Sequence, residues 1–159
     1  EDLFIHELSD IYSAEKQLTK ALPRLARAAE NPDLATAFET HLEETQGQIE
    51  RIDQVVEILG IRLKRIKCAA MEGLVEEGKE VIDSIDKGPV RDAALIGGAQ
   101  KVEHYEIASY GTIAALAKQL GYKDALPLLL ETLEEEKATD EKLTLLAKGG
   151  GNAKAAQAA

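Results

Sequence analysis

Apolar side chains recur along most of this chain at the three- and four-residue spacing of α-helices. We expect long helices over residues 2–29, 33–59, 89–120 and 124–148, and a shorter one near 68–86. One apolar stripe supports each helix, in chain order Leu8, Ile11, Leu18, Leu22 and Leu25; Phe38, Leu42, Ile49, Ile52 and Val56; Met71, Leu74, Ile82 and Ile85; Val102, Ile113 and Leu116; Leu129, Leu133, Leu143 and Ala147.

The breaks between these segments carry residues that begin and end helices. Asn31 followed by Pro32 is typical of an N-cap with proline at the first helical position. Gly60 and Gly121 are expected to end the second helix and the third long one. Asp124 is expected to cap the last helix.

The short connections also predict how the helices pack. Residues 2–59 form one hairpin and residues 89–148 a second, so the helices within each hairpin run antiparallel. The crossover between the hairpins holds the shorter helix at about 68–86. The sequence therefore predicts an all-α domain over residues 1–148, an antiparallel four-helix bundle with a fifth short helix in the crossover. The Gly- and Ala-rich residues 149–159 are expected to form a flexible tail.

Composition and charge narrow the classes of function. The 159 residues are 45% hydrophobic and 30% charged, which is typical of a soluble globular domain. The formal net charge of −10 argues against nucleic acid or an anionic membrane surface as a partner. No apolar run is long enough to cross a bilayer and no signal peptide is visible, so we expect a cytoplasmic protein. A single cysteine, Cys68, leaves no internal disulfide and no cysteine-based metal cluster.

The second hairpin repeats the pattern of the first. A shift of 91 residues aligns Glu15 with Glu106 and Glu44 with Glu135, although a chain rich in Ala, Leu and Glu also repeats such letters by chance. At about 1.5 Å rise per residue, Glu15 and Glu44 lie roughly 24 and 20 Å from the turn that joins their helices. If the hairpins pack about a pseudo-two-fold axis, four carboxylates meet near the middle of the bundle.

Carboxylates at such a level need a counter-charge. Glu15 interrupts the apolar stripe of the first helix, and an unpaired ionised carboxylate in the interior costs several kcal/mol. Iron and manganese accept hard oxygen donors, and bridging carboxylates hold two such ions together. Glu103, one turn before Glu106, is a further candidate. We therefore predict a two-metal site, with iron favoured and manganese as the alternative, ligated by Glu15, Glu44, Glu103, Glu106 and Glu135.

Parts of this interpretation stay open at the level of sequence. Di-iron helical bundles use Glu-x-x-His pairs, but Gly47 and Ala138 occupy the histidine positions here. On the last helix Glu136 falls on the apolar stripe, so the ligand is either Glu135 or Glu136. Without a metal the glutamates would stay protonated or pair with cations such as Arg51. The protein would then be a non-catalytic dimeric scaffold or interaction protein with a metal-free core.

Other polar side chains give weaker signals. His6 and His41 are interpreted as surface or hydrogen-bonded residues rather than catalytic bases, although His41 lies one turn before Glu44. Tyr12 and Tyr110 lie near the carboxylate level and can hydrogen-bond to it. No Ser/His/Asp or Cys/His arrangement indicates a nucleophilic enzyme.

Four stretches together carry a family resemblance: YSAEKQL at 12–18, HLEET at 41–45, VEHYEI at 102–107 and LEEEKATD at 133–140. With them the chain resembles the YciE/YciF-type ferritin-like stress proteins of bacteria. The resemblance implies a five-helix ferritin-like fold, a homodimer, induction under stress and kinship with di-iron carboxylate proteins. By that kinship the same five glutamates are the metal ligands. If the protein is an enzyme, which the sequence leaves open, it would oxidise ferrous iron or reduce peroxide or dioxygen, with Tyr12 or His41 in support.

Overall fold

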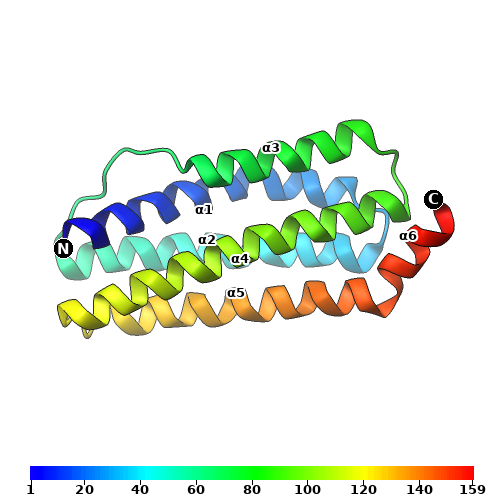
Figure 1. The fold of residues 1–159 in the computed structure, drawn as a ribbon. Helices are drawn as coiled ribbons and strands as arrows, with labels where there is room; N and C mark the ends of the chain where they lie inside the picture. The colour runs from blue at the N-terminus through cyan, green and yellow to red at the C-terminus, as the bar shows by residue number, and fades with distance from the viewer.

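Helices account for most of the chain, which the computed structural model describes from residue 1 to residue 159 (Figure 1). The helices are α1 (Asp2–Ala28), α2 (Pro32–Leu59), α3 (Ala69–Ser84), α4 (Pro89–Leu120), α5 (Leu126–Leu146), a π-helical turn (Ala147–Gly151) and α6 (Asn152–Ala158). The structure contains no strand. The five helices predicted from the apolar pattern are confirmed, with ends that differ by at most two residues.

Four of the helices form an antiparallel bundle. α1 packs against α2 and α4 against α5 within the two hairpins, and α1 also contacts α4 while α2 contacts α5. The crossover leaves the far end of α2, and α3 then runs back along the outside of α1 and α4 (Figure 1). This arrangement confirms the predicted all-α bundle with a fifth helix in the crossover. None of the helices is both long and apolar enough to span a bilayer.

The helix ends follow the predicted signals at most positions. The Asn31 side chain accepts a hydrogen bond of 2.9 Å from the backbone N–H of Asp33, as expected of an N-cap. Gly60 and Gly121 end their helices with φ of 61° and 75°, in the left-handed region that favours glycine. The prediction that Asp124 caps the last helix is wrong. α5 begins one residue later than such a cap allows, after Ala125, whose helical backbone angles leave no side chain in a capping position.

Asp92, near the start of α4, forms hydrogen bonds with the loop that joins α1 to α2. Its buried carboxylate accepts the backbone N–H groups of Glu30 and Asn31, each at 2.8 Å. Replacing Asp92 with alanine is expected to lower the free energy of unfolding by about 2–4 kcal/mol, because two backbone N–H groups lose a charged acceptor. Asp92→Asn is expected to cost about half as much, since its amide presents only one acceptor oxygen. Urea denaturation at neutral pH measures both, and a loss under about 1 kcal/mol for alanine contradicts this role.

The last residues differ from the expected flexible tail. Residues 149–159 continue through the π-helical turn into α6, which packs against α4. The Ala-rich sequence of α6 has high helix propensity. Gly150, with φ of 122°, provides the change of direction that lets this short helix fold back.

Candidate metal centre

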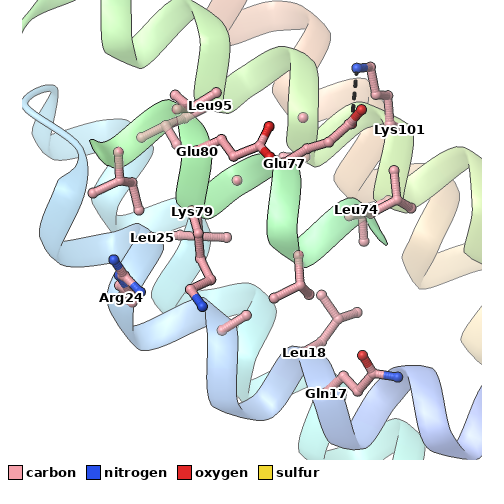
Figure 2. Close-up of a pocket in the computed structure, with 18 of the residues that line it drawn as sticks. Gln17, Leu18, Arg24, Leu25, Leu74, Glu77, Lys79, Glu80, Leu95 and Lys101 are labelled. Atoms are coloured by element: carbon pink, nitrogen blue, oxygen red, sulfur yellow. Dashed lines mark hydrogen bonds and ion pairs between the residues drawn. The ribbon is translucent and has the colours of Figure 1, made fainter. Parts of the chain in front are cut away.

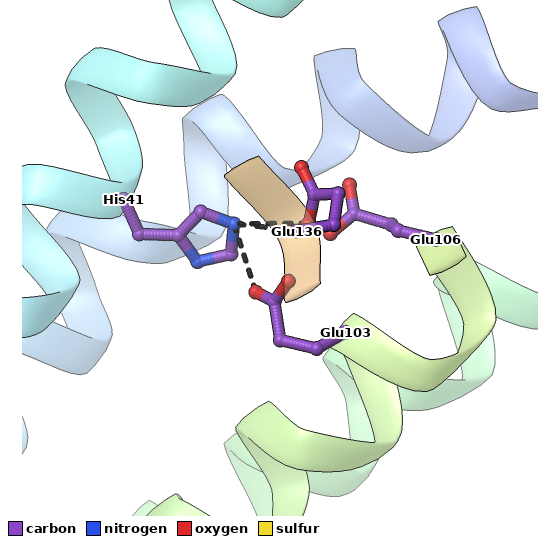
Figure 3. Close-up of side chains that lie close together, drawn as sticks. All are labelled: His41, Glu103, Glu106 and Glu136. Atoms are coloured by element: carbon purple, nitrogen blue, oxygen red, sulfur yellow. Dashed lines mark ion pairs between the residues drawn. The ribbon is translucent and has the colours of Figure 1, made fainter. Parts of the chain in front are cut away.

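Polar side chains replace apolar ones at one level of the bundle interior. Glu15 of α1, His41 of α2, Glu103 and Glu106 of α4, and Glu136 of α5 all point inward. The four glutamates have no exposed surface, and the histidine is 4% exposed. Figure 3 shows the histidine and three of the glutamates converging from α2, α4 and α5. We call these five residues the core cluster.

The distances within the core cluster suit the coordination of a cation. Nε2 of His41 lies 3.0 Å from a carboxylate oxygen of Glu103, 3.8 Å from one of Glu106 and 4.0 Å from one of Glu136. One ligand atom from each of these four residues lies within 4.8 Å of all the others. Three helices therefore deliver an imidazole nitrogen and three carboxylates to a single buried point.

Most polar side-chain atoms of the core cluster have no hydrogen-bond partner in the protein. Both carboxylate oxygens of Glu103, Glu106 and Glu136 are buried without a hydrogen bond, as are Oε2 of Glu15 and Nε2 of His41. Leaving such a group unpaired in a protein interior costs about 1–3 kcal/mol, and more when it is charged. No lysine or arginine forms an ion pair with these glutamates. Carboxylate oxygens together with an imidazole nitrogen suit iron or manganese, so the residues present fit a metal ion.

Burial also changes the protonation of the core cluster. It raises the pKa of Glu15 to about 8, and the charge of Glu136 adds to the shift. Burial likewise raises the pKa of Glu103 to about 8, with Glu15 contributing by like-charge repulsion. The pKa values of Glu106 and Glu136 are raised well above the usual range, mainly by burial and by neighbouring carboxylates. Without a cation, the cluster therefore retains protons at neutral pH.

Tyr110 holds one member of the core cluster in place. Its buried hydroxyl donates a hydrogen bond of 2.7 Å to Oε1 of Glu15. Burial and the adjacent Glu15 carboxylate raise the pKa of Tyr110 well above its usual value, so the phenol remains a donor. Of the two tyrosines expected near this level, the structure brings only this one to the cluster. The ring of Tyr12 instead lies under the ammonium group of Lys16, 5.1 Å from the ring centroid.

Glu135 lies outside the core cluster, on the partly exposed face between α2 and α5. Arg51 donates hydrogen bonds of 2.6 and 2.8 Å to its two oxygens, and Gln48 donates a third of 3.1 Å. Although partial burial opposes ionisation, these bonds lower the pKa of Glu135. Arg51 was a predicted cation partner, and it neutralises this glutamate rather than the buried ones. Of the two alternatives on the last helix, the structure brings Glu136 into the core cluster and leaves Glu135 outside it. Which residues ligate a metal stays a prediction.

Glu44, the fifth predicted ligand, occupies the rim of the core cluster. It is partly buried and accepts a hydrogen bond of 3.1 Å from the hydroxyl of Thr139. Its charge contributes to the raised pKa of Glu103, which places its carboxylate near the cluster. Its role as a ligand stays a prediction.

The internal duplication explains why Glu15 and Glu106 were correctly expected in the interior and why Glu44 and Glu135 were not found there. Glu15 and Glu106, related by the 91-residue shift, are both fully buried, and Glu44 and Glu135 are both partly exposed. On α2 and α5, the polar residues that face the interior are at other positions of the 91-residue repeat. They are the buried pairs His41 and Thr132, Thr45 and Glu136, and Gln48 and Thr139, each separated by the same shift. The two hairpins thus bury equivalent positions, but the side chains that could ligate a metal occupy different ones of these positions on α2 and α5.

Comparison with known proteins agrees with the fold and with the resemblance. The family described as "Domain of unknown function (DUF892)" matches residues 1–156. Protein YciF of Escherichia coli (strain K12) is 69% identical over 156 residues, which cover 98% of this chain and 94% of the relative. The crystal structure of the E. coli stress protein YciF has a TM-score of 0.92 over 96% of each chain. YcfI from Rhodopseudomonas palustris is 50% identical, with a TM-score of 0.86 over 91% of this chain and 92% of its own. The chain therefore belongs to the DUF892 family, and its resemblance to the YciF-type stress proteins is confirmed.

Proposed function

We propose that this protein binds iron inside the bundle, at a two-metal centre built on the core cluster. The observation that supports this most strongly is the set of seven buried carboxylate oxygens, from four glutamates, that have no hydrogen-bond partner. Ionised and unpaired, each such glutamate costs several kcal/mol, and one or two cations at their common level would offset this cost together.

Two groups of side chains could each hold one ion. A first ion would be held by one ligand atom each from His41, Glu103, Glu106 and Glu136. Glu15 lies close enough to its neighbours that the charge of Glu136 raises the pKa of Glu15, and the charges of Glu136 and Glu15 raise the pKa of Glu106. These carboxylates would help to hold a second ion, with Glu44 at the rim as a further ligand. Manganese is the alternative metal because it accepts the same donors.

The surroundings of the core cluster determine what a bound metal can do. Bound iron would supply one-electron redox chemistry, such as the oxidation of ferrous iron or the reduction of peroxide. Tyr110 fixes the orientation of Glu15 through its hydrogen bond, and the complete burial of the glutamates keeps bulk water from them. The relative from E. coli is described as a stress protein, which supports a role for this chain in a stress response.

Metal analysis of the purified protein tests the proposal. After expression with added iron, we expect near-stoichiometric metal that a chelator removes and added ferrous iron restores. Less than about 0.2 metal ions per chain at neutral pH contradicts the proposal, since a site linked to folding fills in proportion to the protein.

Variants of two neighbouring glutamates test which of the two alternatives on α5 is the ligand. Glu136→Gln is expected to weaken metal binding at least tenfold, because it removes one carboxylate of the buried set. Glu135→Gln is the matched control and is expected to bind metal as the wild type does, since Arg51 already neutralises this carboxylate. Titration with Mn²⁺, followed by calorimetry, measures both affinities. If only Glu135→Gln loses metal binding, Glu135 rather than Glu136 is the ligand.

The raised pKa values support a second candidate, a dimeric scaffold whose core needs no metal. A protonated carboxyl group can donate a hydrogen bond to a neighbouring carboxylate, for example between Glu15 and Glu106, so the cluster can satisfy itself at neutral pH. A ligand that binds only the folded state raises its stability. A melting temperature that neither chelator nor added metal changes therefore favours the scaffold. The homodimer stays a prediction, and gel filtration tests it.

A further inference from the structure

A cavity of about 660 Å³ lies between the crossover helix α3 and the bundle. Residues of α1, α3 and α4 line it (Figure 2). Its volume is within the range of about 300–1,000 Å³ that is usual for small-molecule sites. None of the core-cluster residues lines it, so it is a separate feature of the molecule.

The fold builds this cavity by holding α3 at its two ends. At the start of α3, the backbone N–H of Cys68 donates a hydrogen bond of 2.9 Å to the hydroxyl of Ser13 in α1. At its end, the guanidinium of Arg91 in α4 donates a hydrogen bond of 2.7 Å to the carbonyl of Ile85. Between these ties, Met71 is the only buried residue of α3. The apolar side chains in the middle of the helix are packed against the core but only partly buried, so they leave room between α3 and the bundle.

The floor of the cavity is apolar. Leucines from all three helices face it, namely Leu18, Leu25, Leu74 and Leu95 (Figure 2). Gly98 of α4 also lines it, and a Cβ at this position would have no atom within 4 Å. Such a surface attracts hydrocarbon, because a chain that fills it removes apolar area from water and gains dispersion contacts.

The residues that line the cavity include more basic than acidic side chains, although four of the five cations form exposed pairs with acidic residues. Five lining residues are Lys or Arg and two are Glu, whereas the whole chain has a net charge of −10. Arg24 of α1 and Lys79 of α3 lie on the same side of the opening (Figure 2). They pair with Asp83 at 3.3 Å and Glu76 at 3.6 Å. These pairs are exposed and therefore weak, so an incoming anion can compete for both cations.

We propose that this cavity binds a fatty carboxylate, with its alkyl chain between α3 and the bundle and its carboxylate at Arg24 and Lys79. The apolar floor selects the alkyl chain, and the guanidinium of Arg24 and the ammonium group of Lys79 select a negative headgroup. The site is independent of any metal in the core cluster.

Calorimetric titration of the full chain with decanoate, well below its micellar concentration, tests the site. We expect saturable binding of one decanoate per chain. Gly98→Leu fills the cavity from α4 and is expected to weaken binding at least tenfold. The matched control is Gly97→Leu, on the exposed side of the same helix, which is expected to bind as the wild type does. Unsaturable binding, or unchanged affinity in the folded Gly98→Leu protein, overturns the proposal.

Further variants give a second test of the cavity and test whether Arg24 and Lys79 bind the carboxylate of decanoate. If Gly98→Leu lowers the melting temperature, Ala94→Leu fills the same cavity without altering a glycine, and it must show the same loss of binding. The double variant Arg24→Gln/Lys79→Gln is expected to weaken decanoate at least fivefold and to leave 1-decanol unchanged. If decanol binds the wild type as tightly as decanoate, the proposed role of the carboxylate is wrong.

Discussion

Replacing Glu106 with leucine is expected to stabilise the metal-free protein and to abolish its response to metal. The side chain is completely buried, and both of its oxygens lack a hydrogen-bond partner. A buried polar group without a partner costs about 1–3 kcal/mol, and an apolar side chain of similar size removes that cost. We expect a gain of this size at pH 7.5 in the presence of a chelator, measured by urea denaturation.

Added metal is expected to stabilise the wild type more than the Glu106→Leu variant, which is the opposite of the order expected without metal. At a free metal concentration of about one hundred times Kd, binding to the folded state adds about 2.7 kcal/mol to the wild type. Glu106→Leu is expected to gain less than about a third of this, because a shared ligand is lost. Glu134→Leu, on the exposed side of α5, is the control and should respond to metal normally. A metal-free Glu106→Leu protein that is less stable than the wild type would show that this carboxylate is already satisfied.

These opposite effects distinguish a binding site from a structural polar core. A polar cluster retained for packing should lose stability when one member is removed, whether or not metal is present. A site prepared for a cation should instead gain stability without the cation and lose the cation's contribution. Comparing stability with and without metal in one variant therefore decides between the metal centre and the scaffold.

The sequence predicted the helices well because their breaks carry strong local signals. Asn31-Pro32, Gly60 and Gly121 act through backbone geometry that neighbouring residues alone determine. The C-terminal helix α6 was missed because Gly149 to Gly151 is a strong helix-breaking signal. There, packing of α6 against α4 overrides local preference.

The core cluster was predicted only in part because apolar residues alone defined each stripe. On α2, the predicted apolar stripe included Leu42 and Val56, which are only partly buried. The buried positions are the preceding residues, His41 and Val55. The buried positions follow alternating steps of three and four residues, Leu34, Phe38, His41, Thr45, Gln48, Ile52 and Val55. The same steps on α5 give Leu129, Thr132, Glu136, Thr139 and Leu143. This spacing, applied without regard to polarity, identifies His41, which was not among the predicted ligands, and Glu136, which was the alternative to Glu135.

The contacts that separate Glu135 from Glu136 could not be inferred from one helix alone. Arg51 lies on α2, and its pairing with Glu135 depends on how α2 and α5 face each other. The duplication aligned Glu44 with Glu135 correctly, but it does not report which side of either helix faces inward. Sequence repeats thus reveal equivalent positions, whereas burial depends on the rotation of each helix in the bundle.

The stability of the metal-free protein is expected to fall as the pH rises from about 5 to about 8. Glu15 and Glu103 have pKa values of about 8 when folded, against 4.5 as the ordinary value that the unfolded chain approaches. Between these values the folded state holds protons that the unfolded state has released, so rising pH favours unfolding. Each retained proton gives a slope of about 1.4 kcal/mol per pH unit. A single proton retained over this range therefore costs about 4 kcal/mol.

Urea denaturation at a series of pH values, in the presence of a chelator, measures this decline. The double variant Glu15→Gln/Glu103→Gln is expected to flatten it, because neither amide titrates. With saturating Mn²⁺ the trend should reverse, since metal and protons compete for the same oxygens and metal binds more tightly as pH rises. A wild-type stability that is constant across this range without metal would mean that the buried carboxyl groups titrate as they do in water. The core cluster would then be open to solvent, and neither a cation nor shared protons would be needed to stabilise it.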